Sequence, residues 1–196
     1  MELMKESIGA ILDNIQSAEE YLNEEDVKEF IKILINSKNI FVIGAGRSGL
    51  AGRAFAMRLM HLGLSSYVVG ETISPAIYED DCILAISGSG ETNTCVNAAK
   101  ISKDRGAKVL ALTSNPDSSL GKLADSLIYV QGRTKQEVDD EDYLKRQIKG
   151  NYTSLTPLGT AFELTSLIFL DGLVCELMEV LGETESDLKS RHTVLE

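Results

Sequence analysis

Five short apolar runs constrain this chain more than any other feature of its sequence. They occupy residues 40–43, 66–69, 83–86, 109–112 and 127–130. A run that is apolar at every position is typical of a parallel strand that is buried on both faces. Helix-like segments separate most of the runs, at residues 48–62, 92–105 and about 117–124, whereas only a short segment with a turn near Pro75 separates the second run from the third.

Alternating strands and helices predict an α/β fold, in which a doubly wound sheet of five parallel strands has right-handed crossovers. The commonest arrangement is a three-layer sandwich with the flavodoxin-like strand order 2-1-3-4-5. A length of 196 residues predicts a single domain. We divide it into N-terminal helices (1–36), the sheet (37–131), a charged loop (132–155) and a C-terminal helix with a tail (156–196).

The last part of the chain contains two contrasting segments. From Arg133 to Lys149 acidic residues are followed by basic ones, and we interpret this stretch as a solvated loop or a loose surface helix. Residues 156–181 are apolar almost all round, and a helix without a polar face is buried on several sides. In a chain this small we expect that burial between subunits of a symmetric homo-oligomer.

Composition excludes several classes of function. A formal net charge of −11 argues against a nucleic-acid partner, because binding to phosphodiester chains requires basic patches. The three cysteines form no Cys-x-x-Cys pair, and their odd number favours a reduced, cytoplasmic setting. The N-terminus lacks a signal-peptide pattern, and no apolar run approaches the roughly 18–20 residues that span a bilayer, so we expect no membrane association.

The first glycine-rich loop, Gly44-Ala45-Gly46-Arg47-Ser48-Gly49, lies between a predicted strand and a predicted helix. It matches G-x-G-x-x-G, a weak signal that also fits a dinucleotide-binding fingerprint. Glu71 follows the second strand, where a ribose-binding carboxylate would lie. A dinucleotide-binding oxidoreductase is therefore one alternative.

The second loop, Ser87-Gly88-Ser89-Gly90-Glu91-Thr92, follows the third strand. In the order 2-1-3-4-5, strands one and three are neighbours whose crossovers leave in opposite directions, so both loops flank one crevice. Four hydroxyl groups and two helix N-termini would converge there, which suits a compact phosphate monoester; the hydroxyls belong to Ser48, Ser87, Ser89 and Thr92. Arg47 adds positive charge or pairs with a nearby carboxylate, and the alternative role for the hydroxyls is helix capping.

These two loops resemble the paired motifs of the sugar isomerase (SIS) domain family. The segments Arg58–Gly63, Val69–Thr72 and Gly159–Glu163 resemble one branch of it, the 6-phospho-3-hexuloisomerases. The resemblance implies interconversion of D-arabino-hex-3-ulose 6-phosphate and fructose 6-phosphate through a 2,3-enediol, a step in formaldehyde assimilation by the ribulose monophosphate pathway. It also implies no metal and no organic cofactor, and a homotetramer with sites near subunit boundaries.

Glu163 is the candidate base, because it matches the family's base position and lies in an apolar helix, where desolvation favours a carboxylate that accepts a proton. The alternative is structural, because Thr160-x-x-Glu163 is also a capping box. His61 ends a helix roughly 20 Å from the first loop, so it is either a proton shuttle across an interface or a structural residue. Glu71 and Thr72 would meet sugar hydroxyls or form a simple turn, and His192 lies in a polar tail that could fold over a neighbouring subunit.

Two further functions stay open at this point. A non-catalytic phosphosugar sensor would use the same loops, although this chain has neither room for a helix-turn-helix domain nor the basic charge of one. Another aldose-ketose phosphate isomerase of the same superfamily would share the fold, because the stereochemistry of the sugar depends on small displacements of side chains.

Overall fold

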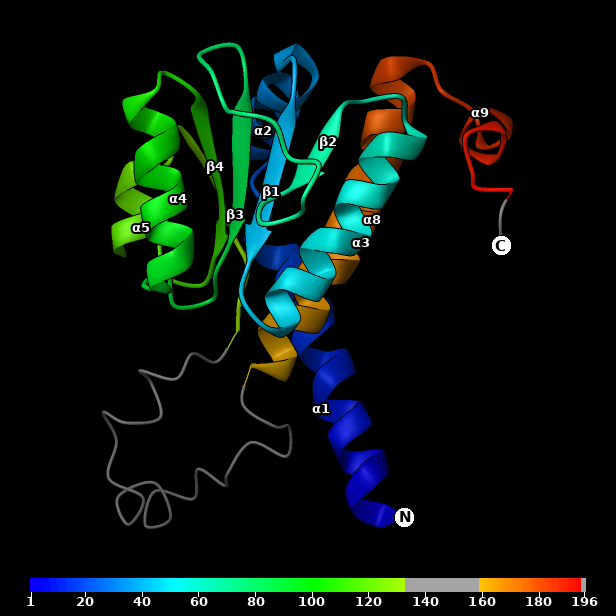
Figure 1. Ribbon diagram of the computed structural model, residues 1–196. Helices are drawn as coiled ribbons and strands as arrows, with labels where there is room; N and C mark the ends of the chain where they lie inside the picture. The colour runs from blue at the N-terminus through cyan, green and yellow to red at the C-terminus, as the bar shows by residue number, and fades with distance from the viewer. Residues whose placement is uncertain (133–158, 195–196) are drawn as a thin grey trace.

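Five parallel strands form one sheet in the order β2-β1-β3-β4-β5, in a computed structural model that describes residues 1–132 and 159–194 (Figure 1). The predicted fold class is therefore confirmed. In register, Ile40 of β1 lies opposite Ser66 of β2 and Cys82 of β3. The charged segment 133–149 lies outside the described residues. The strands are β1 (Ile40–Gly44), β2 (Ser66–Val68), β3 (Cys82–Ile86), β4 (Lys108–Thr113) and β5 (Ser126–Tyr129).

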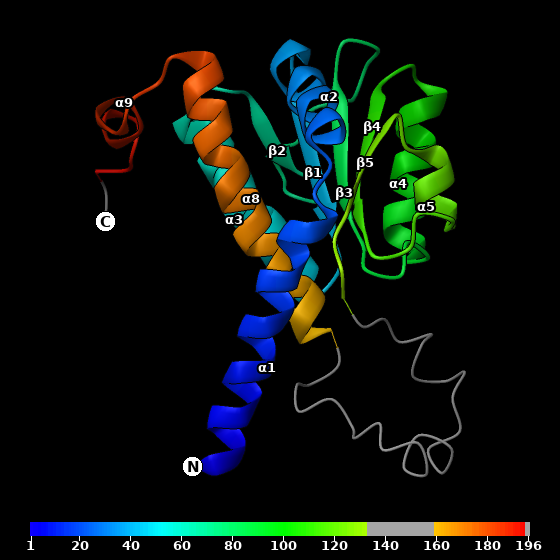
Figure 2. The same ribbon diagram turned by 180° about the vertical axis from the view of Figure 1, so that it is seen from behind.

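Helices cover both faces of the sheet, which explains the continuous apolar runs within its strands. On β3, Leu84 and Ile86 belong to one core cluster, while Ile83 and Ala85 belong to the other. The first cluster includes residues of α2 (Glu24–Asn36), α3 (Arg47–His61) and α8 (Thr160–Leu181); the second includes residues of α4 (Asn93–Asp104) and α5 (Ser119–Leu123) (Figures 1 and 2). Outside this sandwich lie α1 (Glu2–Ala18), η1 (Glu19–Tyr21) and α9 (Glu185–Ser190).

The direction of the crossovers changes between β1 and β3. The chain leaves β1 through α3 on one face, and it leaves β3 through α4 on the opposite face (Figure 1). The carboxyl ends of these two neighbouring strands therefore flank the topological switch point, where ligands bind in open α/β sheets.

The C-terminal helix differs from the sequence-based prediction. It begins at Thr160 rather than Thr156, after Gly159 with φ +87°. Its buried side chains pack within the chain, against α3 and α1, while Asp171, Glu176 and Glu179 lie on an exposed polar face. Burial of this helix therefore does not require a second subunit. Within the described part of the chain, neither α8 nor any other helix has the length and apolar character needed to cross a membrane.

A buried carboxylate joins the starts of β1 and β3. Asp81 is 2% exposed and accepts hydrogen bonds from the backbone N–H and side-chain amide of Asn39 at 3.1 and 2.8 Å. Its second oxygen accepts from the backbone N–H of Tyr78 at 2.7 Å. This carboxylate therefore fixes the turn that enters β3 and aligns that strand with β1.

Replacement of Asp81 by Ala should lower the free energy of unfolding by about 2–4 kcal/mol, because buried donors lose a charged acceptor. Chemical denaturation monitored by circular dichroism measures the change. Asp80→Ala is the matched control, since the neighbouring Asp80 is exposed, and it should alter stability little. Equal stability of the two variants would show that the Asp81 hydrogen bonds are not structurally important.

Candidate functional site

The first loop turns directly from β1 into α3 because its glycines permit a very close approach. A Cβ atom on Gly49 would lie 2.6 Å from the carbonyl oxygen of Gly44, and one on Gly44 would lie 2.8 Å from the backbone nitrogen of Gly49. Gly46 has φ +58° and forms the N-cap of α3. No side chain fits at Gly44 or Gly49, so the turn brings the N-terminus of α3 to the crevice.

The hydroxyl groups of the two loops are not used as helix caps. Among the described residues, no side chain makes a cap hydrogen bond at the N-terminus of α3 or of α4. Thr92 is the N-cap residue of α4, but its Oγ1 lies 2.9 Å from Oγ of Ser87, across the second loop. The capping alternative for the loop hydroxyls is therefore wrong in this structure. The first-turn N–H groups of both helices are available to an anion.

The second loop is fastened to α5. Gly90 has φ +65°, and a Cβ atom there would lie 1.9 Å from Oγ of Ser118. Its carbonyl oxygen accepts from the backbone N–H of Leu120 at 3.0 Å. The Glu91 carboxylate accepts from the backbone N–H of Ser119 at 2.8 Å, and this bond lowers the pKa of Glu91. Glu91, a predicted substrate-binding residue, therefore has its carboxylate at α5, where it anchors the loop.

Further hydrogen bonds hold the second loop in place. Ser89 Oγ accepts from the backbone N–H of Glu91 at 3.2 Å. The carbonyl oxygen of Gly88 accepts from Thr113 Oγ1 at 3.2 Å and from the backbone N–H of Ser114 at 3.0 Å. These bonds tie the loop to the end of β4, so its conformation is set before a ligand arrives.

The first turn of α8 touches both loops. A Cβ atom on Gly88 would lie 3.1 Å from the Phe162 ring, so this ring packs directly on the second loop. The next residue, Glu163, forms an ion pair with Arg47 of the first loop. The Glu163 side chain is 16% exposed and that of Arg47 is 58% exposed. A carboxylate therefore lies at the N-terminus of α3, on the same helical turn that packs on the second loop.

The capping-box interpretation of Glu163 is wrong in this structure. The N-cap of α8 is Gly159, one residue before Thr160, and no side chain caps this terminus. The Glu163 side chain folds back along the helix, so that its Oε1 would lie 3.1 Å from a Cβ on Gly159. Gly159 thus provides the space in which the carboxylate turns toward Arg47.

Glu71 and Thr72 lie in the turn after β2. The Glu71 carboxylate pairs with Arg53 of α3, and both side chains are about half exposed, at 43% and 54%. This pairing counts against a free ribose-binding carboxylate and therefore against the dinucleotide alternative. Sequence reasoning did not single out Arg53, because its spacing of six residues from Arg47 places it on a different side of the helix. Thr72 is exposed in the same turn.

His61 lies at the far end of α3, as predicted, and is 3% exposed. Its ring stacks on His192 at 5.1 Å between centroids, with 24° between the planes. The C-terminal tail thus folds over its own chain in this structure. Arg191, which sequence reasoning missed, holds the tail: it donates to the His61 carbonyl at 2.8 Å and binds both carboxylate oxygens of Glu183 at 2.7 and 2.9 Å.

The described side chains include two buried cysteines and a limited set of possible metal ligands. Burial raises the pKa of the Cys82 thiol to about 12, and it also raises the pKa of Cys95, so neither is a ready nucleophile. Within residues 1–132 and 159–194, no three His, Cys, Asp or Glu side chains are grouped so that they could hold a metal ion.

Comparison with known proteins gives consistent matches over the whole chain. The profile of the SIS domain matches residues 33–146. A Bacillus subtilis protein named 3-hexulose-6-phosphate isomerase is 37% identical over 191 residues, with 97% of this chain and 98% of that protein covered. A Methanocaldococcus jannaschii protein of the same name is 38% identical, with 93% and 89% covered.

A solved structure agrees with these matches. The crystal structure of a hypothetical protein from Methanococcus jannaschii, described as inferring a molecular function of 3-hexulose-6-phosphate isomerase, superposes with a TM-score of 0.80. It is 36% identical in sequence, and the superposition covers 97% of this chain and 99% of that one.

Acidification should release the C-terminal tail. Burial lowers the pKa of His61, and the nearby charges of His192 and Arg58 lower it further. The folded state therefore binds a proton less readily than the unfolded state, whose histidines titrate near pH ~6.5. The contribution of His61 to docking is complete above that pH and is lost as the pH falls below it.

Hydrogen exchange measured from pH 7.5 to 5 should show falling protection in residues 185–194, while the sheet is unchanged. The charged groups near the pair are Arg58, whose charge disfavours protonation of His61, and Arg191, which is paired with Glu183. In His192→Gln the fall should be smaller, because the nearby charge of His192 that lowers the pKa of His61 is removed. Protection that does not vary with pH in the unaltered protein would contradict this account.

Proposed function

Because this chain belongs to the SIS domain family and is a sugar-phosphate isomerase, we propose that it interconverts D-arabino-hex-3-ulose 6-phosphate and fructose 6-phosphate. The assignment as a sugar-phosphate isomerase rests on relatives named 3-hexulose-6-phosphate isomerase, which align with this chain over most of their length. The identity of the sugar and the positions of its carbonyl group in substrate and product are our proposal. The observation that carries it is the Glu163–Arg47 pair between the two glycine-rich loops.

The phosphate group would bind to the second loop and the two helix N-termini. The hydroxyls of Ser87, Ser89 and Thr92 and the first-turn N–H groups of α4 supply neutral donors. Each hydrogen bond to a charged group contributes about 1.5–3 kcal/mol. Each helix terminus adds about 0.3–1 kcal/mol. Several such contributions together outweigh the screened repulsion from surface carboxylates in a protein of net charge −11.

Glu163 would act as the base that serves both carbons. Its carboxylate takes the proton from C2 of the 3-hexulose, the C–H electron pair forms the C2–C3 double bond, and the C3 oxygen gains a proton. The resulting 2,3-enediol then loses the proton of its C2 hydroxyl, and Glu163 returns a proton to C3. One carboxylate is sufficient, because proton removal and return occur at adjacent carbons.

Arg47 would have two roles in this reaction. Its ion pair would hold the Glu163 carboxylate beside the first loop, and its guanidinium would place positive charge where negative charge develops on the enediol oxygens. Ser48, which is 9% exposed, lies next to it in the first turn of α3 and would contribute a further donor.

The remaining site residues have supporting roles in the proposal. Glu71 and Thr72 would meet the sugar hydroxyls, with Arg53 holding the Glu71 carboxylate in place. His61 is too far from the phosphate loop of its own chain, so it would act as a proton shuttle in the site of a neighbouring subunit. This requires a homo-oligomer, and we propose a tetramer. The reaction would proceed without metal or cofactor, in the cytoplasm, as a step of the ribulose monophosphate pathway.

Replacement of both Ser87 and Ser89 by Ala should weaken binding of fructose 6-phosphate by more than about 100-fold, because two donors to the charged phosphate are lost. Isothermal titration calorimetry measures the change. Ser102→Ala is the control, since Ser102 is buried on α4 and bonds the carbonyl of Ala98 within its own helix. Unchanged affinity in a folded double variant would remove the phosphate-binding role of this loop.

Replacement of Glu163 by Gln should lower kcat by about 10²–10⁴-fold, because the amide has a similar size but cannot accept the proton. Binding of fructose 6-phosphate should change little, since the loops supply most of the ground-state affinity. Glu179→Gln, an exposed position on the same helix, is the matched control and should keep full activity. Proton exchange from the reacting carbon into deuterium oxide should disappear in parallel with turnover.

A phosphosugar sensor would give the opposite result. It needs the loops but no base, so Glu163→Gln would leave its ligand response intact, and the unaltered protein would show no exchange of sugar protons with solvent. Full turnover in the Gln variant would leave the isomerase assignment in place but would exclude Glu163 as the base.

A further inference from the structure

The first turn of α8 packs on a second glycine as well as on Gly88. A Cβ atom on Gly132, which follows β5, would lie 2.4 Å from the Cβ of Phe162 and 2.7 Å from its Cα. These atoms belong to the backbone and stem of Phe162 rather than to a flexible side-chain end, so the helix itself would have to move. Gly132 does not have a positive φ, so the close approach alone requires glycine at this position.

Gly88 and Gly132 lie at the carboxyl edge of the sheet and are linked through the end of β4. The Thr113 carbonyl oxygen accepts from the backbone N–H of Val130 at 3.0 Å, and the Thr113 hydroxyl donates to the carbonyl oxygen of Gly88 at 3.2 Å. Phe162 is 3% exposed and contacts both glycines, with its ring on Gly88 and its backbone on Gly132. The second loop and the end of β5 together therefore fix the position of Phe162.

The first helix attaches α8 to the end of β5. Along part of their length α1 and α8 lie side by side (Figures 1 and 2). Asn14 of α1 donates from Nδ2 to Oγ1 of Thr165 at 2.9 Å, and Oγ of Ser17 lies 3.2 Å from Oε1 of Gln131. Thr165 is 3% exposed and lies two residues after Glu163. The hydrogen bond from Asn14 therefore reaches the same part of α8 as the glycine contacts.

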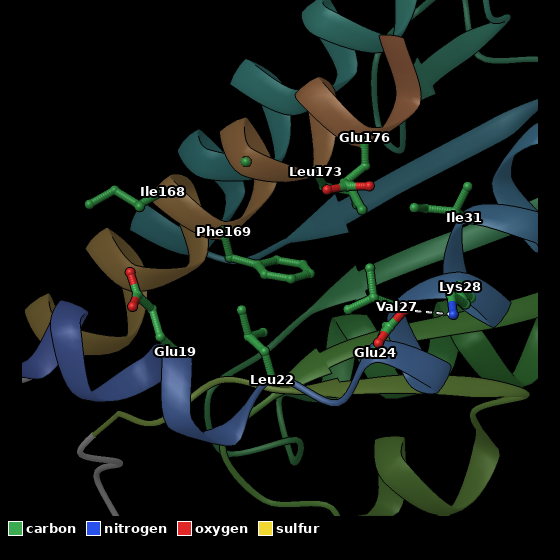
Figure 3. A pocket seen from close by; sticks show the side chains of 11 residues that line it. Glu19, Leu22, Glu24, Val27, Lys28, Ile31, Ile168, Phe169, Leu173 and Glu176 are labelled. Carbon is green, nitrogen blue, oxygen red and sulfur yellow. Dashed lines mark ion pairs between the residues drawn. The ribbon is translucent and has the colours of Figure 1, made fainter. Parts of the chain in front are cut away.

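Packing between α8 and the segment that follows α1 is incomplete farther along the helix. A groove of about 610 Å³ lies between η1, α2 and α8, and its walls include Leu22 and Phe169 (Figure 3). Phe169 lies one helical turn beyond Thr165 on the same side of α8. The Asn14–Thr165 hydrogen bond is therefore a specific contact that aligns α8 at its N-terminal end, where the base lies.

We propose that Gly132 and Asn14 are positioning residues for the Glu163 carboxylate. This inference rests on the proposed function, in which Glu163 is the base. Among the described side chains none caps the N-terminus of α8, and the Arg47 side chain that pairs with Glu163 is 58% exposed. The backbone of Glu163 is thus held by its neighbours in the helix, which contact the two glycines and α1.

Proton transfer is sensitive to this placement. Non-bonded carbon atoms prefer a separation of about 3.5–4.0 Å, so a Cβ atom at 2.4 Å would displace Phe162, and Glu163 with it, by at least about 1 Å. A displacement of that size costs about 10²-fold in rate when it moves a reacting group. The phosphate-binding loops have their own hydrogen bonds to β4 and α5, so ligand affinity should be affected much less.

Replacement of Gly132 by Ala should therefore lower kcat by about 10–100-fold, while the affinity for fructose 6-phosphate in isothermal titration calorimetry is unchanged. Gly172→Ala is the matched control, because it is the same substitution within α8 at a position where a Cβ atom would meet nothing within 4 Å, and it should keep full activity. In a Glu163→Gln background, Gly132→Ala should cause no further loss of kcat, because the group that it positions is already removed. An unchanged kcat, an affinity that falls in parallel with kcat, or a further loss in the Gln background would overturn the proposal.

Replacement of Asn14 by Ala tests the same role without crowding the helix, and it decides the matter if Gly132→Ala does not fold. Alanine is the best helix former, so α1 itself is not weakened. The value of kcat should fall by about 2–10-fold, the range for one neutral hydrogen bond, again with unchanged affinity. Addition of Thr165→Val should cause no further loss. Asn36→Ala, which removes a bond to the Lys32 carbonyl within α2, is the control. Full activity of Asn14→Ala, or losses that add, would contradict the proposal.

Failure of this proposal is distinguishable from failure of the proposed function. Loss of turnover in Glu163→Gln together with full turnover in Gly132→Ala and Asn14→Ala would overturn the positioning role alone. Full turnover in Glu163→Gln would exclude Glu163 as the base, and it would overturn the positioning role as well.

Discussion

The crevice depends on the first turn of α8, where two consecutive residues reach two different loops. Phe162 packs on Gly88, which follows β3, and Glu163 pairs with Arg47, which follows β1. These loops are almost forty residues apart in the sequence, and α8 begins almost seventy residues after the second one. The turn therefore joins the switch point of the sheet to a helix from the other end of the chain. Without it the loops could bind an anion, but no carboxylate would stand beside that anion.

An acidic protein can bind an anionic ligand when its donors are local and neutral. The net charge of −11 is spread over the surface, where water and salt screen it. In the crevice the donors are hydroxyls, backbone N–H groups and helix termini, whose directions are fixed by the glycine turns. Arg47 is the one cation placed there by the described contacts, and it is held by the group that the proposed reaction needs.

Local patterns predicted the sheet and both loops because these features depend on short stretches of chain. The continuous apolar runs reflect strands covered on both faces, and Gly44 and Gly49 reflect a turn that excludes any Cβ atom. The switch point followed from strand order, which connection rules restrict strongly. The C-terminal helix was interpreted less well, because its apolar composition did not reveal that α1 and α3 of the same chain cover it.

The sequence by itself thus determined the fold class, the strand order and the two loops at one crevice. Only the tertiary structure decided the partners of charged and polar side chains: Arg47 with Glu163, Arg53 with Glu71, and Arg191 with Glu183 and the His61 carbonyl. The tertiary structure also decided the start of α8. The sequence predicted a capping box with Thr160 as the N-cap, whereas the N-cap is Gly159, one residue earlier. The physical reason is the separation in sequence of the residues that interact. Backbone patterns arise from neighbours in sequence, whereas an ion pair depends on where distant elements bring two side chains together.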